Sequence, residues 1–118
     1  MTKKTNTQKG KDAEEIAVKF LQNFGCEIIE RNYRYKRGEI DIIARHEKII
    51  IFVEVKSRKN NNFGFPEEAV SDKKAELIHQ TADNYLIDNN LTNEIRFDII
   101  AITGVESNIE IEHLIDAF

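Results

Sequence analysis

Two stretches of the chain carry apolar residues at the three- and four-residue steps of an amphipathic helix. The first runs from Lys9 to Phe24 and is followed by Gly25, which suits the left-handed position that often ends a helix. The second follows Ser71, whose side chain suits a helix start, and ends near residues 89–90. We therefore expect two helices, each with one buried face.

The remaining apolar segments are short and rich in β-branched residues, which is typical of strands; they cover residues 26–35, 40–44, 49–55, 95–103 and 109–113. The order α-β-β-β-α-β-β predicts a single α/β domain over residues 1–118, with a small mixed sheet flanked by a helix on each face. The second helix would be the crossover that makes strand 95–103 parallel to strand 49–55. Residues 1–8 are polar and lysine-rich, so we expect a flexible start.

Segments 40–44 and 49–55 are joined by four polar residues and should form a hairpin. A loop centred between His46 and Glu47 would place Glu39 opposite Glu54, and Asp41 opposite Phe52 and diagonal to Glu54. One face of this hairpin would be wholly apolar, carrying Ile40, Ile42, Ala44, Ile49, Ile51, Val53 and Val55. The other face would gather its charges at the end away from the turn: Glu39, Asp41, Glu54 and Lys56.

This group of charges is unusual for strands with two packed faces. Two carboxylates about 5 Å apart repel by roughly 3 kcal/mol at an effective dielectric constant of about 20. Lys56 offsets only part of that repulsion, and a hard cation such as Mg²⁺, which prefers oxygen ligands, would remove it. A solvated strand end with an ordinary ion pair is the alternative, and the residues alone leave both interpretations open.

Composition limits the class of protein. Apolar residues make up 41% and charged residues 32% of the chain, which favours a soluble globular domain over a disordered one. The longest apolar run, Ile49–Val53, is too short to span a bilayer, so we expect no membrane partner. The single cysteine, Cys26, excludes an internal disulfide and suits a cytoplasmic protein, in which it would be a small buried hydrophobic residue.

The net charge of −4 argues against a nucleic-acid partner, but the charge is unevenly distributed. Residues 1–81 hold 16 basic and 13 acidic residues, whereas residues 82–118 hold 1 and 8. The positive charges gather on both sides of the predicted hairpin, where they would suit phosphate contacts. The candidates are Arg31, Arg34, Lys36, Arg37, Arg58, Lys59 and Lys73. Lys74 beside Lys73 would lie near the same charged end of the hairpin, and both lysines would also suit a solvated helix surface.

Other polar residues look structural. The three histidines, His46, His79 and His113, are isolated and lack the spacing of metal ligands. Asp98 alternates with apolar neighbours on a strand, and we expect a structural salt bridge with Arg96 or a helix lysine. None of these residues enters the functional hypotheses.

The separation between Asp41 and the run Glu54-Val55-Lys56 resembles the PD-(D/E)xK signature of restriction-endonuclease-like nucleases, with Ile40 in place of the nominal proline. Further motifs resemble the YraN-like family, which is described as similar to archaeal Holliday-junction resolvases. They are Gly10, Glu14 and Ala17 in the first helix, RNY at 31–33, GEIDII at 38–43, FVEVKSR at 52–58, FG at 63–64, RFD at 96–98 and DAF at 116–118. The resemblance covers nearly the whole chain.

The resemblance implies a metal-dependent phosphodiesterase with the restriction-endonuclease-like αβββαβ core. Asp41 and Glu54 would bind Mg²⁺ or Mn²⁺ together with the Val55 carbonyl, and Lys56 would orient or help to deprotonate the attacking water. Glu14 matches an acid that such nucleases often add from the first helix; an ordinary acid near a helix start is the alternative. Glu39 would be either a further acid of the metal site or a salt-bridge partner of a nearby base.

Three functions follow as hypotheses. The first is a DNA endonuclease of repair or recombination that selects branched or damaged DNA. A homodimer would match the two-fold symmetry of a junction. The second is a nucleic-acid-binding module with a vestigial site. The third is a regulatory protein-interaction domain, for which the acidic C-terminal third would be suited.

Overall fold

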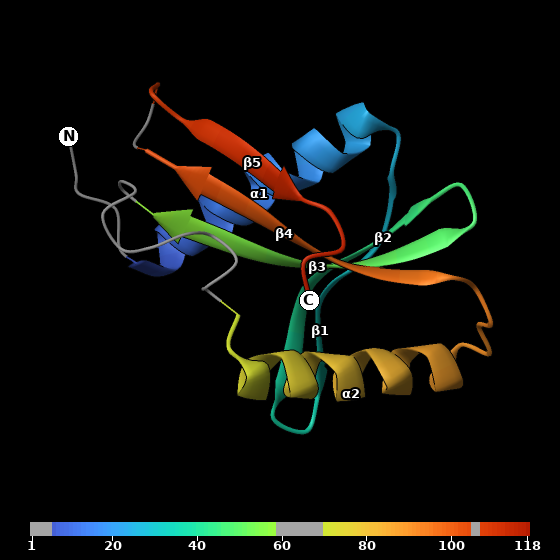
Figure 1. The fold of residues 1–118 in the computed structure, drawn as a ribbon. Coiled ribbons are helices and arrows are strands. Elements are labelled where there is room, and N and C mark those ends of the chain that lie inside the picture. Colours follow the sequence, from blue (N-terminus) through green and yellow to red (C-terminus); the bar gives the residue numbers. More distant parts are fainter. Residues whose placement is uncertain (1–5, 59–69, 105–106) are drawn as a thin grey trace.

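The computed structural model describes residues 6–58, 70–104 and 107–118. Its elements are α1 (Asn6–Phe24), β1 (Glu27–Tyr35), β2 (Gly38–His46), β3 (Ile49–Arg58), α2 (Asp72–Asp88), β4 (Ile95–Thr103) and β5 (Glu110–Leu114), as Figure 1 shows. This is the order predicted from the sequence. Helix α1 begins within the segment expected to be flexible, because residues 6–8 are helical; residues 1–5 lie outside the described part.

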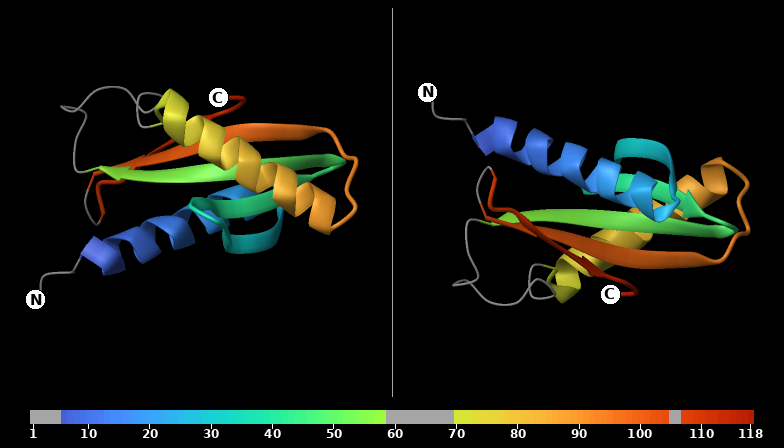
Figure 2. Two further views of the ribbon diagram at one scale, coloured as in Figure 1. Left: turned by 90° about the horizontal axis from the view of Figure 1, so that it is seen from below. Right: turned by 90° about the horizontal axis from the view of Figure 1, so that it is seen from above.

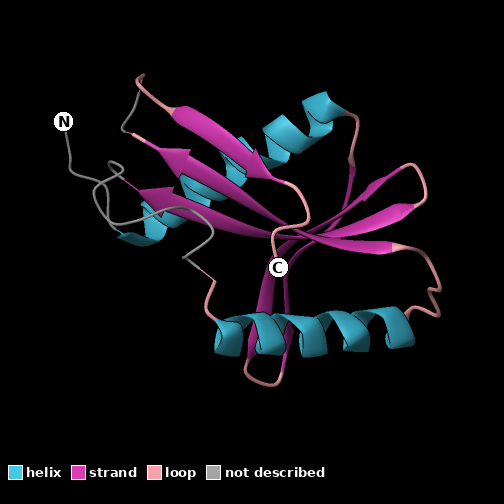
Figure 3. Cartoon of the chain, in the orientation of Figure 1, coloured by secondary structure: helices cyan, strands magenta, loops and turns pink. Residues whose placement is uncertain are grey.

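The five strands form one mixed sheet in the order β1-β2-β3-β4-β5. Strands β3 and β4 are parallel, and the other neighbouring pairs are antiparallel. Helix α2 makes the crossover between β3 and β4, as predicted. Figures 2 and 3 show the sheet between the two helices, with α1 on one face and α2 on the other. No helix within the described residues is long and apolar enough to cross a membrane.

Each helix covers its own hydrophobic core. The core under α1 includes Leu21, Ile42, Ile51, Val53 and Ile100. The core under α2 includes Ile40, Ile43, Ile50, Phe52 and Tyr85. The alternation of strand residues between the two faces therefore explains why both faces of β2 and β3 are apolar.

The end of α1 and the start of α2 are as their sequences indicate. Gly25 has a φ of 105°. The neighbouring Cys26 N–H donates to the Leu21 carbonyl, five residues earlier, at 2.9 Å, and this is the bond of a Schellman motif that spans more residues. Cys26 is free and buried, as expected. At the start of α2, the Ser71 hydroxyl accepts a hydrogen bond from the Lys74 N–H at 3.2 Å. This hydrogen bond caps the first turn of α2.

The predicted register of the β2–β3 hairpin is wrong by two residues. The turn consists of Glu47 and Lys48, and His46 pairs with Ile49. Glu47 has a positive φ of 57°, which a two-residue hairpin turn requires. The sequence of this turn does not indicate that conformation. Phe52 consequently lies opposite Ile43 rather than Asp41. Because a shift of two residues preserves the faces, Asp41 and Glu54 still belong to one side of the hairpin.

Strand β2 separates from β3 near Asp41, and we call this point the fork. Pairing of β2 with β3 begins at Ile42, whereas pairing of β2 with β1 continues to Gly38. Beyond the fork the β1–β2 hairpin turns toward α2, so that its tip lies beside that helix (Figure 1). The turn explains a second error: Ile40 was expected on the face of Ile42, but it packs in the core under α2.

Candidate metal and nucleic-acid site

A hollow of about 310 Å³ lies at the fork, between the start of β2 and the first turns of α2. Its charged lining residues are Arg37, Glu39, Asp41, Glu54 and Lys74. Leu77 and Ile78 of α2, with Gly38 of the hairpin, complete the lining. The separation of β2 from β3 therefore creates a hollow, and acidic side chains from both strands border it.

Asp41 links the two strands where their backbones part. Its carboxylate accepts a hydrogen bond from the Val55 N–H at 2.8 Å. Burial and, next to it, the nearby charge of Glu54 raise the pKa of Asp41 from 3.8 to about 7, and the hydrogen bond from Val55 opposes this shift with a smaller effect. Glu14 and Glu39 add smaller effects in the same direction. The negative charge at this carboxyl group is therefore strongly disfavoured.

Glu54 lies on β3 and is buried. Its carboxylate accepts a hydrogen bond from the Lys74 ammonium at 2.7 Å, which forms a salt bridge between β3 and α2. The structure thus brings Asp41, Glu54 and one lysine to the same hollow, but that lysine is Lys74. Lys56 is exposed and is not among the residues that line the hollow.

Glu14 approaches the fork from α1. Its carboxylate accepts a hydrogen bond from the Asn32 side chain at 3.0 Å and lies 3.6 Å from the Arg31 guanidinium. Asn32 stands opposite Asp41 in the β1–β2 register, with a positive φ of 52° that asparagine tolerates better than most residues. Glu14 therefore belongs to the electrostatic surroundings of Asp41, although it does not line the hollow.

Glu39 forms the salt bridge that was one of its two predicted roles, and its role as a metal-site acid stays a prediction. It lines the hollow, and its carboxylate also forms a salt bridge with Arg34 at 2.7 Å. Both side chains of that pair are at least one-third exposed, so water weakens the pair considerably. Glu39 is the most accessible acid of the group.

The two carboxylates Asp41 and Glu54 fit a metal ion that takes its other ligands from water. Within the described ranges 6–58, 70–104 and 107–118, no three acidic, histidine or cysteine side chains are arranged to hold a metal ion. Mg²⁺ commonly binds proteins through one or two carboxylates and takes its other ligands from water and phosphate. Asp41 and Glu54 match that requirement, because both are carboxylates that border one hollow.

The basic residues predicted to contact phosphate have different surroundings. Arg31 is paired with Glu15 and Glu14, and Arg34 with Glu39. Lys73 is exposed on the first turn of α2, Arg58 is half-buried near the end of β3, and Lys59 lies outside the described residues. Arg37 is exposed and borders the hollow at the fork.

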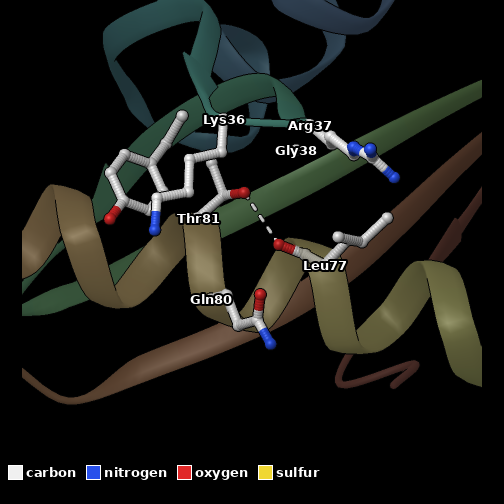
Figure 4. A pocket seen from close by; sticks show the side chains of 7 residues that line it. Lys36, Arg37, Gly38, Leu77, Gln80 and Thr81 are labelled. Atoms are coloured by element: carbon white, nitrogen blue, oxygen red, sulfur yellow. Dashed lines mark hydrogen bonds between the residues drawn. The ribbon is translucent and has the colours of Figure 1, made fainter.

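The tip of the β1–β2 hairpin forms a second hollow with α2, of about 220 Å³ (Figure 4). Lys36 and Arg37 border it from the hairpin, and Gln80 and Thr81 from the helix. The Lys36 ammonium lies 5.2 Å from the centre of the Tyr35 ring. Figure 4 shows Lys36 and Arg37 extending to opposite sides of the tip. Arg37 borders both hollows, so it connects them.

Close backbone packing holds this tip against α2. A Cβ atom at Gly38 would lie 1.8 Å from the Thr81 hydroxyl oxygen, so only glycine fits here without movement. The Thr81 hydroxyl donates to the Leu77 carbonyl at 2.7 Å, and this bond fixes the oxygen that Gly38 contacts. Gly38 therefore sets the distance between the hairpin tip and the helix.

Asp98 is structural, as expected. Its carboxylate accepts two hydrogen bonds from Arg96 at 2.9 Å each and one from the Asp116 N–H at 3.0 Å. It also lies 2.7 Å from the His113 Nε2. Burial alone would raise the pKa of Asp98, but these hydrogen bonds outweigh burial and lower it. The network joins β4, β5 and the C-terminal residues.

Sequence reasoning placed Lys74 near the charged end of the hairpin but missed its contact with Glu54, and it missed the roles of Asn32 and His113. The position of Lys74 in the first turn of a capped helix was visible, but its direction depends on how α2 crosses the sheet. Asn32 follows a basic residue inside a strand and gives no signal of a left-handed conformation. His113 was set aside because it lacks metal-ligand spacing, and its contact with Asp98 depends on the β4–β5 register.

The fold and hollow together define a small mixed α/β protein with acidic side chains at a fork in its sheet. The model of the uncharacterised protein family UPF0102 matches residues 13–102, and the chain belongs to that family. A UPF0102 protein of Clostridioides difficile is 51% identical over 114 residues, which cover 96% of this chain and 98% of that protein. One from Flavobacterium psychrophilum is 44% identical over 109 residues, or 92% of each chain. One from Sulfurihydrogenibium is 45% identical over 113 residues, or 95% of each chain.

Proposed function

We propose that this protein is a divalent-metal-dependent phosphodiesterase that cleaves DNA and is related to the restriction-endonuclease-like nucleases. The observation that carries the proposal is that Asp41 and Glu54, from two strands that separate beside them, border the same hollow. The sequence motif around these acids and the element order α-β-β-β-α-β agree with that relationship. The proposal explains why a small domain keeps carboxylates beside its core.

Asp41 and Glu54 would hold the ion, and Mg²⁺ and Mn²⁺ both suit oxygen ligands. The Val55 N–H points toward Asp41, and in an extended strand the carbonyl of a residue points to the same side as its N–H. The Val55 carbonyl is therefore a candidate third ligand at the fork. The bound ion would polarise the phosphate and favour a deprotonated water.

Lys56 remains the candidate for the residue that orients the attacking water or helps to deprotonate it. It follows Glu54 by two residues on β3, on the same face and roughly 7 Å further along the strand. A flexible lysine side chain can cover that distance. The water oxygen would form the new bond to phosphorus and lose one proton to solvent, while the bond to the leaving sugar oxygen would break and that oxygen would take up one proton from solvent. Lys56→Ala should lower the turnover rate more than DNA affinity.

Arg37 suggests the path of the DNA. It connects the acidic hollow with the second hollow, where Lys36 and Gln80 offer further polar contacts. A phosphodiester backbone that follows the hairpin tip would meet these groups and then the acids. Phosphate contacts of this kind give affinity without sequence preference, which suits an enzyme that selects the shape of DNA, such as a branch or junction.

A specific observation also favours a non-catalytic module. The Lys74 ammonium already neutralises Glu54, and Glu14 and Glu39 have partners as well. An acidic group satisfied in this way need not bind an ion, and the protein would then only bind nucleic acid. The two functions differ in whether DNA is cut, so an assay of cleavage separates them.

The test is incubation of the purified protein with Mg²⁺ or Mn²⁺ and a panel of single-stranded, duplex, flap and four-way DNA. We expect cleavage that EDTA stops and that Asp41→Asn and Glu54→Gln abolish. Glu112→Gln, a change of an exposed acid on β5, is the matched control and should leave cleavage intact. DNA binding without cleavage under all conditions would favour the non-catalytic module.

A further inference from the structure

Lys74 is the lysine that the structure places inside the acidic hollow. Its ammonium lies 2.7 Å from a Glu54 carboxylate oxygen, while the end of the Glu54 side chain is almost wholly shielded from water. Lys74 lies on the first turn of α2, on the same side of the helix as Leu77 and Ile78, which also border the hollow. The lysine therefore points from the helix into the site.

The backbone of Lys74 is held in place while its side chain keeps freedom of movement. Its N–H donates to the Ser71 hydroxyl in the cap of α2, so the position of its Cα is fixed at the mouth of the hollow. The side chain itself is 43% exposed, and lysine has a long, flexible stem. Its ammonium can leave Glu54 by rotation of the side chain, without movement of the helix.

We propose that Lys74 occupies the cation position in the metal-free protein and moves to a phosphate oxygen of the bound DNA when the ion binds. This inference rests on the proposed function. An ammonium and a divalent ion compete for the same Glu54 carboxylate, and the divalent ion has the larger charge. The displaced ammonium stays at the mouth of the hollow because its backbone is capped there.

The new position of Lys74 complements that of Arg37. Arg37 borders the hollow from the hairpin and Lys74 borders it from α2, so the two cationic side chains come from different walls. A phosphodiester that enters between these walls would meet one cationic group on each side. Lys74 would thus be a phosphate-binding residue of the substrate complex as well as a substitute for the ion in the free protein.

The first measurement is calorimetric titration of Mn²⁺ into the full-length protein and its Lys74→Gln variant. Removal of the competing positive charge should tighten Mn²⁺ binding by about three- to tenfold. Lys48→Gln is the matched control because Lys48 is an exposed lysine in the β2–β3 turn, at the other end of β2 from the hollow, and it should leave Mn²⁺ affinity unchanged. Lys74→Arg keeps the charge and should resemble the wild type.

The second measurement is the affinity for a fluorescent four-way DNA at saturating Ca²⁺, an ion that allows binding to be measured separately from cleavage. Lys74→Gln should bind this DNA about fivefold or more weakly than Lys48→Gln, because it lacks one phosphate contact. Opposite effects on ion and DNA affinity are the signature of a group that exchanges one partner for the other. A purely structural salt bridge would not produce them.

Two results would overturn the inference. One is that Lys74→Gln binds both Mn²⁺ and DNA as Lys48→Gln does. The other is that Lys74→Gln binds Mn²⁺ more weakly than the wild type. Asp41→Asn distinguishes this failure from failure of the proposed function. If Asp41→Asn abolishes Mn²⁺ binding while Lys74→Gln has no effect, only the role of Lys74 is wrong. If Asp41→Asn binds Mn²⁺ like the wild type, the proposed metal site is itself wrong.

Discussion

The Asp41 carboxylate accepts a hydrogen bond from the Val55 N–H at 2.8 Å, at the point where β2 and β3 separate. A side chain thus replaces the backbone partner that a continuous hairpin would have supplied to β3. The arrangement holds the fork open and places a carboxylate beside Glu54. Asp41 therefore both satisfies the Val55 N–H and brings its carboxylate close to that of Glu54, where the two negative charges repel each other.

Asp41→Asn should stabilise the metal-free protein at pH 8, because asparagine keeps an acceptor for the Val55 N–H and removes the charge. The folded-state pKa of about 7 lies above the ordinary 3.8, so ionised Asp41 opposes folding, and its cost develops as the pH rises from 3.8 to 7. The upper bound is roughly 4 kcal/mol. Thermal unfolding in EDTA at pH 8 and pH 4 measures the effect.

The gain in stability of Asp41→Asn over the wild type should shrink toward pH 4, where Asp41 is protonated in the folded protein. Glu39→Gln is the control, since Glu39 is more exposed and paired with Arg34, and it should change stability by less than about 1 kcal/mol. A lower stability of Asp41→Asn at pH 8 would contradict the account of the fork.

Gly38→Ala should destabilise the protein by about 1–3 kcal/mol, because the new methyl group overlaps the Thr81 hydroxyl oxygen and forces the hairpin tip away from α2. Urea unfolding measures the change. The double variant with Thr81→Ala removes that oxygen and should recover part of the loss. Purely additive effects of the two substitutions would show that the close contact does not exist in solution.

Asp98→Asn should cost about 3 kcal/mol, because it weakens the buried contacts with Arg96 and His113. The pKa of Asp98 is lowered in the folded protein, so its ionised form stabilises folding above pH 3.8, and that contribution is lost as the pH falls below this value. The difference in urea unfolding between Asp98→Asn and the wild type should be smaller at pH 3 than at pH 7. An equal difference at both values would mean that charge is not involved.

Arg37→Ala should reduce the salt dependence of DNA binding, because one phosphate contact is lost. The slope of log affinity against log salt should become less negative by about 0.9 on duplex DNA of any sequence. Arg45→Ala is the matched control, since Arg45 is an exposed arginine at the other end of β2 and is paired with Glu27. Equal slopes for both variants would place the DNA elsewhere.

The sequence was sufficient for the elements and for the two-faced packing, because periods of 3.6 and 2 residues report which side chains are buried. It was also sufficient for the shared face of Asp41 and Glu54, which survives a register shift of two residues. The register itself depended on Glu47 adopting a positive φ, for which glutamate gives no signal. The fork was beyond prediction because it arises from the departure of β2 from β3, and the same is true of the Lys74–Glu54 contact, which depends on the crossing of α2.

The central claim is that Asp41 and Glu54 bind one divalent cation, and calorimetric titration of Mn²⁺ at pH 7.5 tests it most directly. We predict one site per chain, lost in both Asp41→Asn and Glu54→Gln and kept in Glu112→Gln. Binding should also release protons, since the pKa of Asp41 is about 7 without the ion and an adjacent cation lowers it. Mn²⁺ binding of equal affinity and stoichiometry in the wild type, Asp41→Asn and Glu54→Gln, or no binding to the wild type, would contradict the claim.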